Sequence, residues 1–265
     1  MTDIAQTGDQ PSRVTRNYTL AMLVAIYASS HVDRQIVSIL AESIKQELLL
    51  SDTQLGFLIG LSFAIFYATL GIPIAILADR YSRRNIIAIS VIIWSGMTAL
   101  CGLAGSYVQL ALARIGVGIG EAGSSPPSHS MISDLYPPEK RATAMGIYAA
   151  GINIGVLLGF LVGGWIDEWY GWRIAFFVVG LPGVILGLLM FFTVKEPARM
   201  QAPKPMPENI FAEVWDTFKI MMAIPSLRHI VIGTTLVVFV GYGTQPRLDA
   251  GQSPVCNTLY NKCAC

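Results

Sequence analysis

The sequence predicts an all-α integral membrane protein, and three observations support this fold class. Hydrophobic residues make up 53% of the chain and charged residues only 13%, whereas ordinary soluble domains carry about 25% charged residues. The mean hydropathy is +0.55. Apolar stretches of the ~20 residues that a helix needs to cross a bilayer recur along the chain, separated by charges, prolines and polar turns.

Six such stretches predict six membrane-spanning helices within residues 18–194. Residues 1–17 contain charges and a proline but no small-residue cleavage site, so we expect a retained cytoplasmic tail rather than a removable signal peptide. The predicted spans are Tyr18–Leu40, Leu55–Leu77, Asn85–Leu103, Tyr107–Ile132, Ala144–Ile166 and Arg173–Val194.

Basic residues predict the orientation, because they concentrate in cytoplasmic loops. With a cytoplasmic N-terminus, twelve of them fall on the inner side and two on the outer side. The inner ones are Arg13, Arg16, Arg80, Arg83, Arg84, Lys140, Arg141, Lys195, Arg199, Lys204, Lys219 and Arg228, and the outer ones are Lys45 and Arg173. We therefore expect a multi-pass protein of the cell (inner) membrane with its N-terminus in the cytoplasm.

The chain changes character after the sixth span. Residues 195–229 predict a cytoplasmic linker with an amphipathic helix, which lies either on the membrane surface or on the protein. An incomplete seventh span occupies residues 230–244 and is too short to cross. Residues 245–265 depart in composition from the rest and are interpreted as a non-native tail. Its cysteines match no zinc pattern.

Charged side chains inside predicted spans carry the strongest functional signal, because each costs about 2.5–3.5 kcal/mol at the bilayer centre. Asp33 lies seven residues before the outer end of span one, and Arg114 lies seven residues after the outer start of span four. At 1.5 Å per residue, both are about 10 Å below the outer surface. Glu121, seven positions after Arg114, returns to nearly the same helix face.

Two interpretations of these charges stay open. A carboxylate that exchanges a proton as an arginine approaches or withdraws would couple protons to transport. The candidate carboxylates are Asp33 and Glu121, and the candidate arginines are Arg34 and Arg114. Alternatively, a fixed buried ion pair holds spans one and four together. His31 is either a proton relay or a hydrogen-bonded histidine near a helix end.

The turn after the second span carries a resemblance to a known family. Residues 75–84 read Ala-Ile-Leu-Ala-Asp-Arg-Tyr-Ser-Arg-Arg, which is similar to the G-x-L-A-D-R-x-G-R-K signature of the major facilitator superfamily. Ala75 and Ser82 replace two of its glycines. Arg114 to Gly120 resembles the family's fourth-span pattern of an arginine and spaced glycines. The sixth span ends on Glu196-Pro-Ala-Arg199, another family-like feature.

Glycines of the fifth span extend the resemblance, although Phe160 replaces a proline of the family pattern. They are Gly146, Gly155, Gly159, Gly163 and Gly164, and we expect them to serve close helix packing. Pro126 and Pro127 interrupt span four after Glu121 and predict a kink that frees carbonyl groups.

The resemblance implies the N-terminal six-helix bundle of the major facilitator fold, built from an inverted 3+3 repeat. Residues 78–81 and 166–169 align as the corresponding turns of that repeat. The resemblance also implies a conformational latch made of Asp79, Arg80, Arg83 and Arg84. Its partner helix belongs to a C-terminal six-helix half that this chain does not contain.

Subfamily features favour a proton-coupled secondary transporter. Asp33-Arg34, Gly120-Glu121-Ala-Gly and Ser125-Pro-Pro-Ser128 are similar to the spinster-like branch, which implies lipid-like amphiphiles or other small organic substrates. Anion:cation symporters, such as the hexuronate carriers, share part of this pattern and imply organic anions. A non-transporting fragment or accessory subunit is the alternative of another class.

An enzyme is not expected. A hydrolase needs a positioned nucleophile and base, yet Ser128 and His129 are adjacent in the sequence and no Gly-x-Ser-x-Gly occurs. No cofactor, metal or nucleic acid is implied. The expected partners are the lipid bilayer, a small-molecule substrate, the proton and the missing half.

Overall fold

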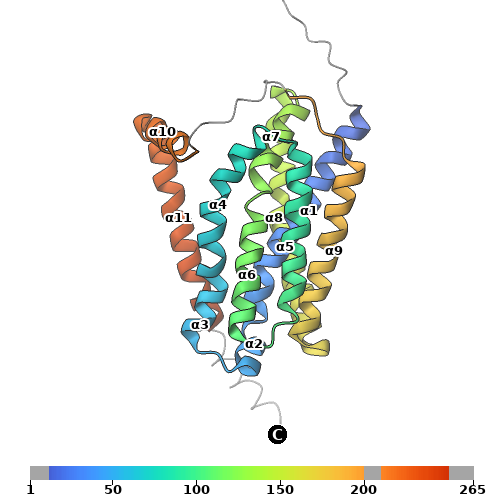
Figure 1. The fold of residues 1–265 in the computed structure, drawn as a ribbon, viewed down its shortest axis with the longest axis vertical. Coiled ribbons are helices and arrows are strands. Elements are labelled where there is room, and N and C mark those ends of the chain that lie inside the picture. The colour runs from blue at the N-terminus through green and yellow to red at the C-terminus, as the bar shows by residue number, and fades with distance from the viewer. Residues whose placement is uncertain (1–11, 200–209, 251–265) are drawn as a thin grey trace, which may run out of the picture. The chain divides into compact units, whose positions relative to one another are not determined.

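The computed structural model describes residues 12–199 and 210–250, and every regular element in these ranges is helical. The chain divides into two units, Met1–Met206 and Pro207–Cys265. In the first unit the long helices run alongside one another as a bundle (Figure 1). Its elements are α1 (Arg13–Ile39), α2 (Ala41–Leu48), α3 (Asp52–Gly56), the π-helix η1 (Phe57–Leu61), α4 (Ser62–Ala78), α5 (Arg83–Cys101), α6 (Tyr107–Glu121), α7 (Ser125–Leu135), α8 (Pro138–Tyr170) and α9 (Trp172–Thr193).

Within residues 12–199, four helical stretches are long and apolar enough to cross a membrane. They are Asp52–Ala78, Arg83–Cys101, Pro138–Tyr170 and Trp172–Thr193. The first predicted span corresponds to α1, which carries Asp33 and Arg34, and the fourth is divided between α6 and α7. The all-helical membrane fold is therefore confirmed, whereas the count of six spans stays a prediction.

Helix α8 packs along α1, while α5 packs between α6 and α9. Glycines on α8 allow the first approach, because a Cβ at Gly155 would collide with the carbonyl oxygen of Ala28. A Cβ at Gly159 would lie 3.1 Å from Gln35 Cβ, and one at Gly163 2.6 Å from Ile36 Cδ1. Within the described chain, close packing does not explain two of the predicted glycines. A Cβ at either Gly146 or Gly164 would meet nothing within 4 Å.

The fourth predicted span is broken where the prolines predicted an interruption. Helix α6 ends at Glu121 and α7 begins at Ser125, with proline in the first turn of α7. The Ser128 hydroxyl donates a hydrogen bond to the Ser124 carbonyl at 2.7 Å. The same carbonyl also accepts the Ser128 backbone amide at 3.1 Å, so it is bonded twice in the first turn of α7.

A polar layer separates two apolar clusters in the bundle. One cluster contains Leu23, Trp94 and Val117, and the other contains Ile36, Cys101 and Leu110. Along each of three helices, a buried polar residue separates the members of one cluster from those of the other. These residues are Asp33 on α1, Thr98 on α5 and Arg114 on α6. The fold therefore places charged groups at the level where the apolar core is interrupted.

Short polar contacts fasten α2 to the ends of α8 and α9. The Ser43 hydroxyl donates to Asp167 at 2.6 Å, and the Trp172 indole donates to Glu47 at 2.5 Å. Glu47 also pairs with Arg173 at 3.2 Å. Asp167, which the predicted repeat aligns with Asp79, thus contacts the connection that follows α1.

The second unit contains α10 (Ile210–Ala223) and α11 (Pro225–Ala250). The two helices meet at a bend of 102° and pass the length and hydropathy requirements only as a pair. The predicted amphipathic helix corresponds to α10. The predicted start of a seventh span, residues 230–244, lies within α11, and the extent of that span stays a prediction. Most of the predicted tail and residues 200–209 of the predicted linker lie outside the described residues.

Candidate functional site

A buried ion pair joins α1 to α6. The Nε and Nη2 atoms of Arg34 both donate to Oε2 of Glu121, each at 2.7 Å. Glu121 is 1% exposed and the Arg34 side chain is 22% exposed, so Arg34 is the partly exposed member of the pair. The other carboxylate oxygen of Glu121, Oε1, has no hydrogen-bond partner among the described residues. The ion pair between these two helices is therefore Arg34–Glu121, not a pair of Asp33 with Arg114.

Asp33 is fully buried and differs from Glu121 in having no donor. Neither carboxylate oxygen has a hydrogen-bond partner within the described part of the chain. Arg114, 1% exposed, directs its Nη1 to the backbone carbonyl of Asp33 at 3.5 Å. The predicted proximity of Asp33 and Arg114 thus exists, but the guanidinium lies against the main chain instead of the carboxylate.

Aromatic rings of α4 cover both arginines. The Arg34 guanidinium carbon lies 5.0 Å from the Phe63 ring centroid and 4.8 Å from that of Tyr67, and the same atom of Arg114 lies 5.7 Å from Phe63. Cation–π attraction of this kind favours a guanidinium where water is excluded. Phe63 was not predicted as part of the site, because an isolated aromatic residue in an apolar run carries no periodic signal.

His31 lies one helical turn from Arg34, towards the start of α1. Its Nδ1 is 2.9 Å from the Tyr27 carbonyl oxygen, and its ring meets the Tyr27 ring edge to face at 4.6 Å. Tyr27 in turn stacks on Tyr148 of α8 at 4.3 Å. These contacts match the hydrogen-bonded alternative for His31, and its part in proton movement stays a prediction.

A second charged cluster occupies the opposite end of the bundle from α2. Arg83, 2% exposed, bonds Glu196 at 3.0 Å, Asp134 at 2.5 Å and the Ser130 hydroxyl at 2.9 Å. These partners lie on α7 and on the segment after α9. The predicted latch residue Arg83 is therefore held by Glu196 and Asp134 rather than by Asp79.

Glu196 caps the N-terminus of α5. It accepts hydrogen bonds from the Ser82 hydroxyl and from the backbone amides of Arg83 and Arg84. Burial alone would raise the pKa of this carboxyl, but the Arg84 amide, the Arg83 side chain and the Ser82 hydroxyl outweigh it and hold the pKa below its usual value. A carboxylate at this position also satisfies the partial positive charge of the helix end.

The latch residues Arg80 and Arg84, and the nearby Arg199, donate hydrogen bonds to backbone carbonyls or to a neighbouring side-chain amide. Arg199 donates to the carbonyls of Ala78, Asp79 and Tyr81 at the end of α4. Arg84 bonds the Asn85 side chain at 2.8 Å, and Arg80 donates to the Ile76 carbonyl at 2.7 Å. Glu196 and Arg199 appeared in the sequence as a family-like ending, but their distance from residues 78–84 along the chain concealed the contact.

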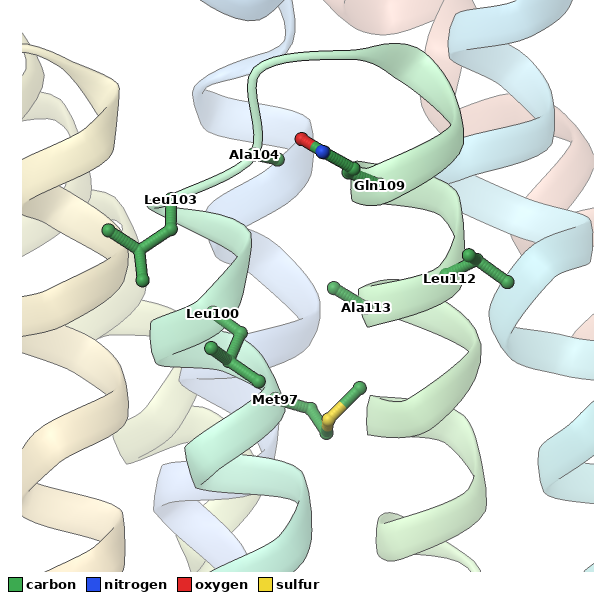
Figure 2. Close-up of a pocket in the computed structure, with 7 residues that line it drawn as sticks. All are labelled: Met97, Leu100, Leu103, Ala104, Gln109, Leu112 and Ala113. Atoms are coloured by element: carbon green, nitrogen blue, oxygen red, sulfur yellow. The ribbon is translucent and has the colours of Figure 1, made fainter.

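An apolar pocket of about 380 Å³ opens between α5 and α6 (Figure 2). Met97 and Leu100 line it from α5, and Leu112 and Ala113 from α6, with Gln109 as its polar residue. None of the predicted charged residues lines this pocket, so it is separate from the candidate site. Within residues 12–199 and 210–250, no three His, Cys, Asp or Glu side chains are grouped to hold a metal.

Residues 23–249 match the family model of the Major Facilitator Superfamily. The chain therefore belongs to the Major Facilitator Superfamily, and the resemblance predicted from its motifs is confirmed at that level. The match covers both the bundle with its buried charges and the second unit.

The chain is similar to curated transport proteins, and these include both kinds that the motifs resemble, a hexuronate transporter and a spinster homolog. It is 33% identical over 223 residues to an MFS-type efflux pump of Mycolicibacterium smegmatis, covering 84% of this chain and 51% of the relative. It is 32% identical over 167 residues to the hexuronate transporter of Bacillus subtilis, covering 63% and 39%. Protein spinster homolog 1 of Homo sapiens is 28% identical over 268 residues, covering 94% and 49%. None of these names denotes an enzyme.

The chain is also similar to solved structures of a transporter. The chain resembles crystal structures of a bacterial homolog to the human lysosomal transporter Spinster in inward-facing unoccupied and occupied conformations. Sequence identity is 38% in both, with TM-scores of 0.74 and 0.72, over 88% of this chain and 55% and 53% of those chains. The chain thus spans about half the length of these relatives.

Proposed function

We propose that this chain supplies the N-terminal half of a proton-coupled secondary transporter for small organic molecules in the cell membrane. In such transporters two halves rock around a site that lies between them near the bilayer midplane. The charged groups of α1 and α6 supply the proton-binding and substrate-binding side chains of this half. The relatives named as a hexuronate transporter and as a homolog of Spinster support the substrate class and the fold.

One observation carries the proposal. Two N–H groups of Arg34 donate to the same oxygen of Glu121, while the second oxygen of Glu121 has no hydrogen-bond partner in the described chain. Because ionised Glu121 occupies the guanidinium, an anionic substrate group cannot take the same donors. A proton on Glu121 neutralises it, releases Arg34 for the substrate anion, and so couples binding of the two.

The substrate class follows from what surrounds the released guanidinium. Arg34 is the partly exposed member of its ion pair, and its charge lies against the rings of Phe63 and Tyr67. A carboxylate or phosphate bound to Arg34 would therefore adjoin an apolar aromatic wall. This arrangement suits small organic anions, and it also suits amphiphiles whose anionic group is attached to an apolar tail.

The test uses the complete transporter in proteoliposomes, with uptake driven by an imposed proton gradient. We expect Asp33→Asn, Glu121→Gln and Arg114→Ala to abolish gradient-driven uptake while the protein still inserts. Glu168→Gln, an exposed carboxylate on α8, is the control and leaves uptake unchanged. If all three variants keep proton-driven uptake, the buried charges, including the Arg34–Glu121 ion pair, are structural and the transport role of this site is wrong.

A second assay separates the two substrate classes. Hexuronates and lysophospholipids, each radiolabelled, are offered to the same proteoliposomes. Uptake of the hexuronate alone assigns the organic-anion class, and uptake of the lysophospholipid alone assigns the amphiphile class.

A further inference from the structure

Two polar groups of α5 lie beside Asp33 without a hydrogen-bond partner of their own. The Trp94 indole N–H and the Thr98 hydroxyl are both buried, and neither has a hydrogen-bond partner in the part of the chain that the structure describes. Both residues are among the polar neighbours of the Asp33 carboxyl. Their donors therefore adjoin a carboxylate that also lacks a partner.

Orphaned buried polar atoms are costly. An unmade hydrogen bond in the interior costs about 1–3 kcal/mol, so a structure that carries an unpartnered acceptor next to unpartnered donors is expected to have a second state in which they meet. Trp94 is fixed in place by the close approach of α6, because a Cβ at Gly120 would lie 2.7 Å from the Trp94 amide nitrogen. A small change in the Asp33 rotamer is then the simplest way to join them.

We propose that Trp94 and Thr98 are positioning residues for Asp33, which donate hydrogen bonds to its carboxylate when it is ionised and are released when it binds a proton. The proton comes from the aqueous side and binds one carboxylate oxygen, and no other bond changes. This inference rests on the proposed role of Asp33 as a proton site. It adds that α5, not only the arginines, holds the ionised form.

Charged and titratable groups also lie near the Asp33 carboxyl. Glu121 and Arg114 face it from α6, and the Cys101 thiol faces it from α5. Arg34, which follows Asp33 on α1, is held by Glu121. The Trp94 indole and the Thr98 hydroxyl carry no charge, so these two donors of α5 can be removed without changing the charge of the set.

The experiment is infrared difference spectroscopy of the purified chain in lipid bilayers, titrated with pH. Subtracting the spectra of Asp33→Asn isolates the carboxylic C=O stretch of Asp33. We expect Trp94→Phe and Thr98→Val each to alter the Asp33 carboxylate bands and to move the titration midpoint by about one pH unit to higher pH, the size expected for loss of one hydrogen bond to a charged group. Thr98→Ser, which keeps the hydroxyl, restores the wild-type midpoint.

Ser95→Ala is the matched control. Ser95 is also on α5, is buried, and has a hydroxyl without a described partner, but that hydroxyl lies against Gly183 of α9. Its removal leaves the Asp33 bands unchanged. Unchanged bands and midpoint in both Trp94→Phe and Thr98→Val overturn the inference alone. Absence of any titrating Asp33 band in the wild-type chain overturns both the inference and the role of Asp33 in proton coupling.

Discussion

Glu196 and Asp33 are two acidic side chains with opposite environments. Glu196 receives hydrogen bonds from Ser82, Arg83 and Arg84, whereas neither oxygen of Asp33 has a partner among the described residues. A fully bonded carboxylate stabilises the state in which it is bonded. An unbonded buried carboxylate instead makes that state sensitive to protonation, and the proposed proton coupling depends on this property.

Stability in acid should depend on Glu196. Because its folded-state pKa lies below the unfolded value of about 4.3, the stability it contributes is present above that value and is lost as the pH falls through the folded-state pKa. We expect Glu196→Gln to lower the free energy of unfolding by about 1–3 kcal/mol at neutral pH and to weaken the loss of stability in acid. Thermal unfolding followed by circular dichroism across pH measures both.

The control for this prediction is Glu168→Gln, an exposed carboxylate near the other end of the bundle. It should unfold like the wild-type chain at every pH. An acid dependence in Glu196→Gln as steep as that of the wild type would show that the helix cap contributes nothing measurable.

Among the elements, helix α8 has glycines that pack against α1 and other glycines with open space beside them. Gly155, Gly159 and Gly163 face α1, where their missing Cβ atoms allow close approach. Gly146 and Gly164 lie on the same helix with open space beside them. The glycine pattern that the family resemblance identified therefore combines positions that pack within this unit with positions that do not.

Alanine at these two kinds of position should have opposite effects. Gly155→Ala places a Cβ against the Ala28 carbonyl oxygen and should lower the free energy of unfolding by about 1–3 kcal/mol, because one helix must shift. Gly164→Ala meets nothing and should be neutral or stabilising by up to about 1 kcal/mol, since alanine favours the helix. Thermal unfolding in one detergent compares them. Equal effects would mean that α1 and α8 do not approach each other closely at Gly155.

The whole molecule combines apolar helices with a strong asymmetry of basic residues. We predict that the turn containing Tyr81 is cytoplasmic and that the turn containing Tyr170 is external. Both side chains are exposed, at 58% and 71%, so each can be replaced by cysteine in a cysteine-free background. An impermeant maleimide applied to intact cells should label Tyr170→Cys, and should label Tyr81→Cys only after permeabilisation. External labelling of Tyr81→Cys would reverse the topology.

Residues 1–265 alone are predicted not to transport. Facilitator-type transport needs two bundles around one site, and this chain spans about half the length of its curated and solved relatives. Purified chain in proteoliposomes with a proton gradient should show no uptake of hexuronates or lysophospholipids above empty vesicles. Robust uptake would establish that two copies of this chain form a working carrier, and would remove the fragment or accessory-subunit alternative.

Helix rise and hydropathy were enough to predict the membrane fold, and the prolines were enough to predict the interruption of span four, whereas the matched depth of Asp33 and Arg114 stays a prediction. These properties depend on distance along a single helix, which the sequence specifies directly. The position of the buried charges could therefore be predicted before any packing was known.

The partners of those charges could not be predicted in this way. That Arg34 rather than Arg114 pairs with a carboxylate, and that Glu196 caps α5 and binds Arg83, depends on how each helix is rotated about its axis and which helix lies beside it. Rotation and neighbourhood result from packing among α1, α5, α6, α7 and the segment after α9, which are far apart in sequence. The spacing of residues within one helix does not determine its contacts with other helices, so these ion pairs and hydrogen bonds are known only from the assembled bundle.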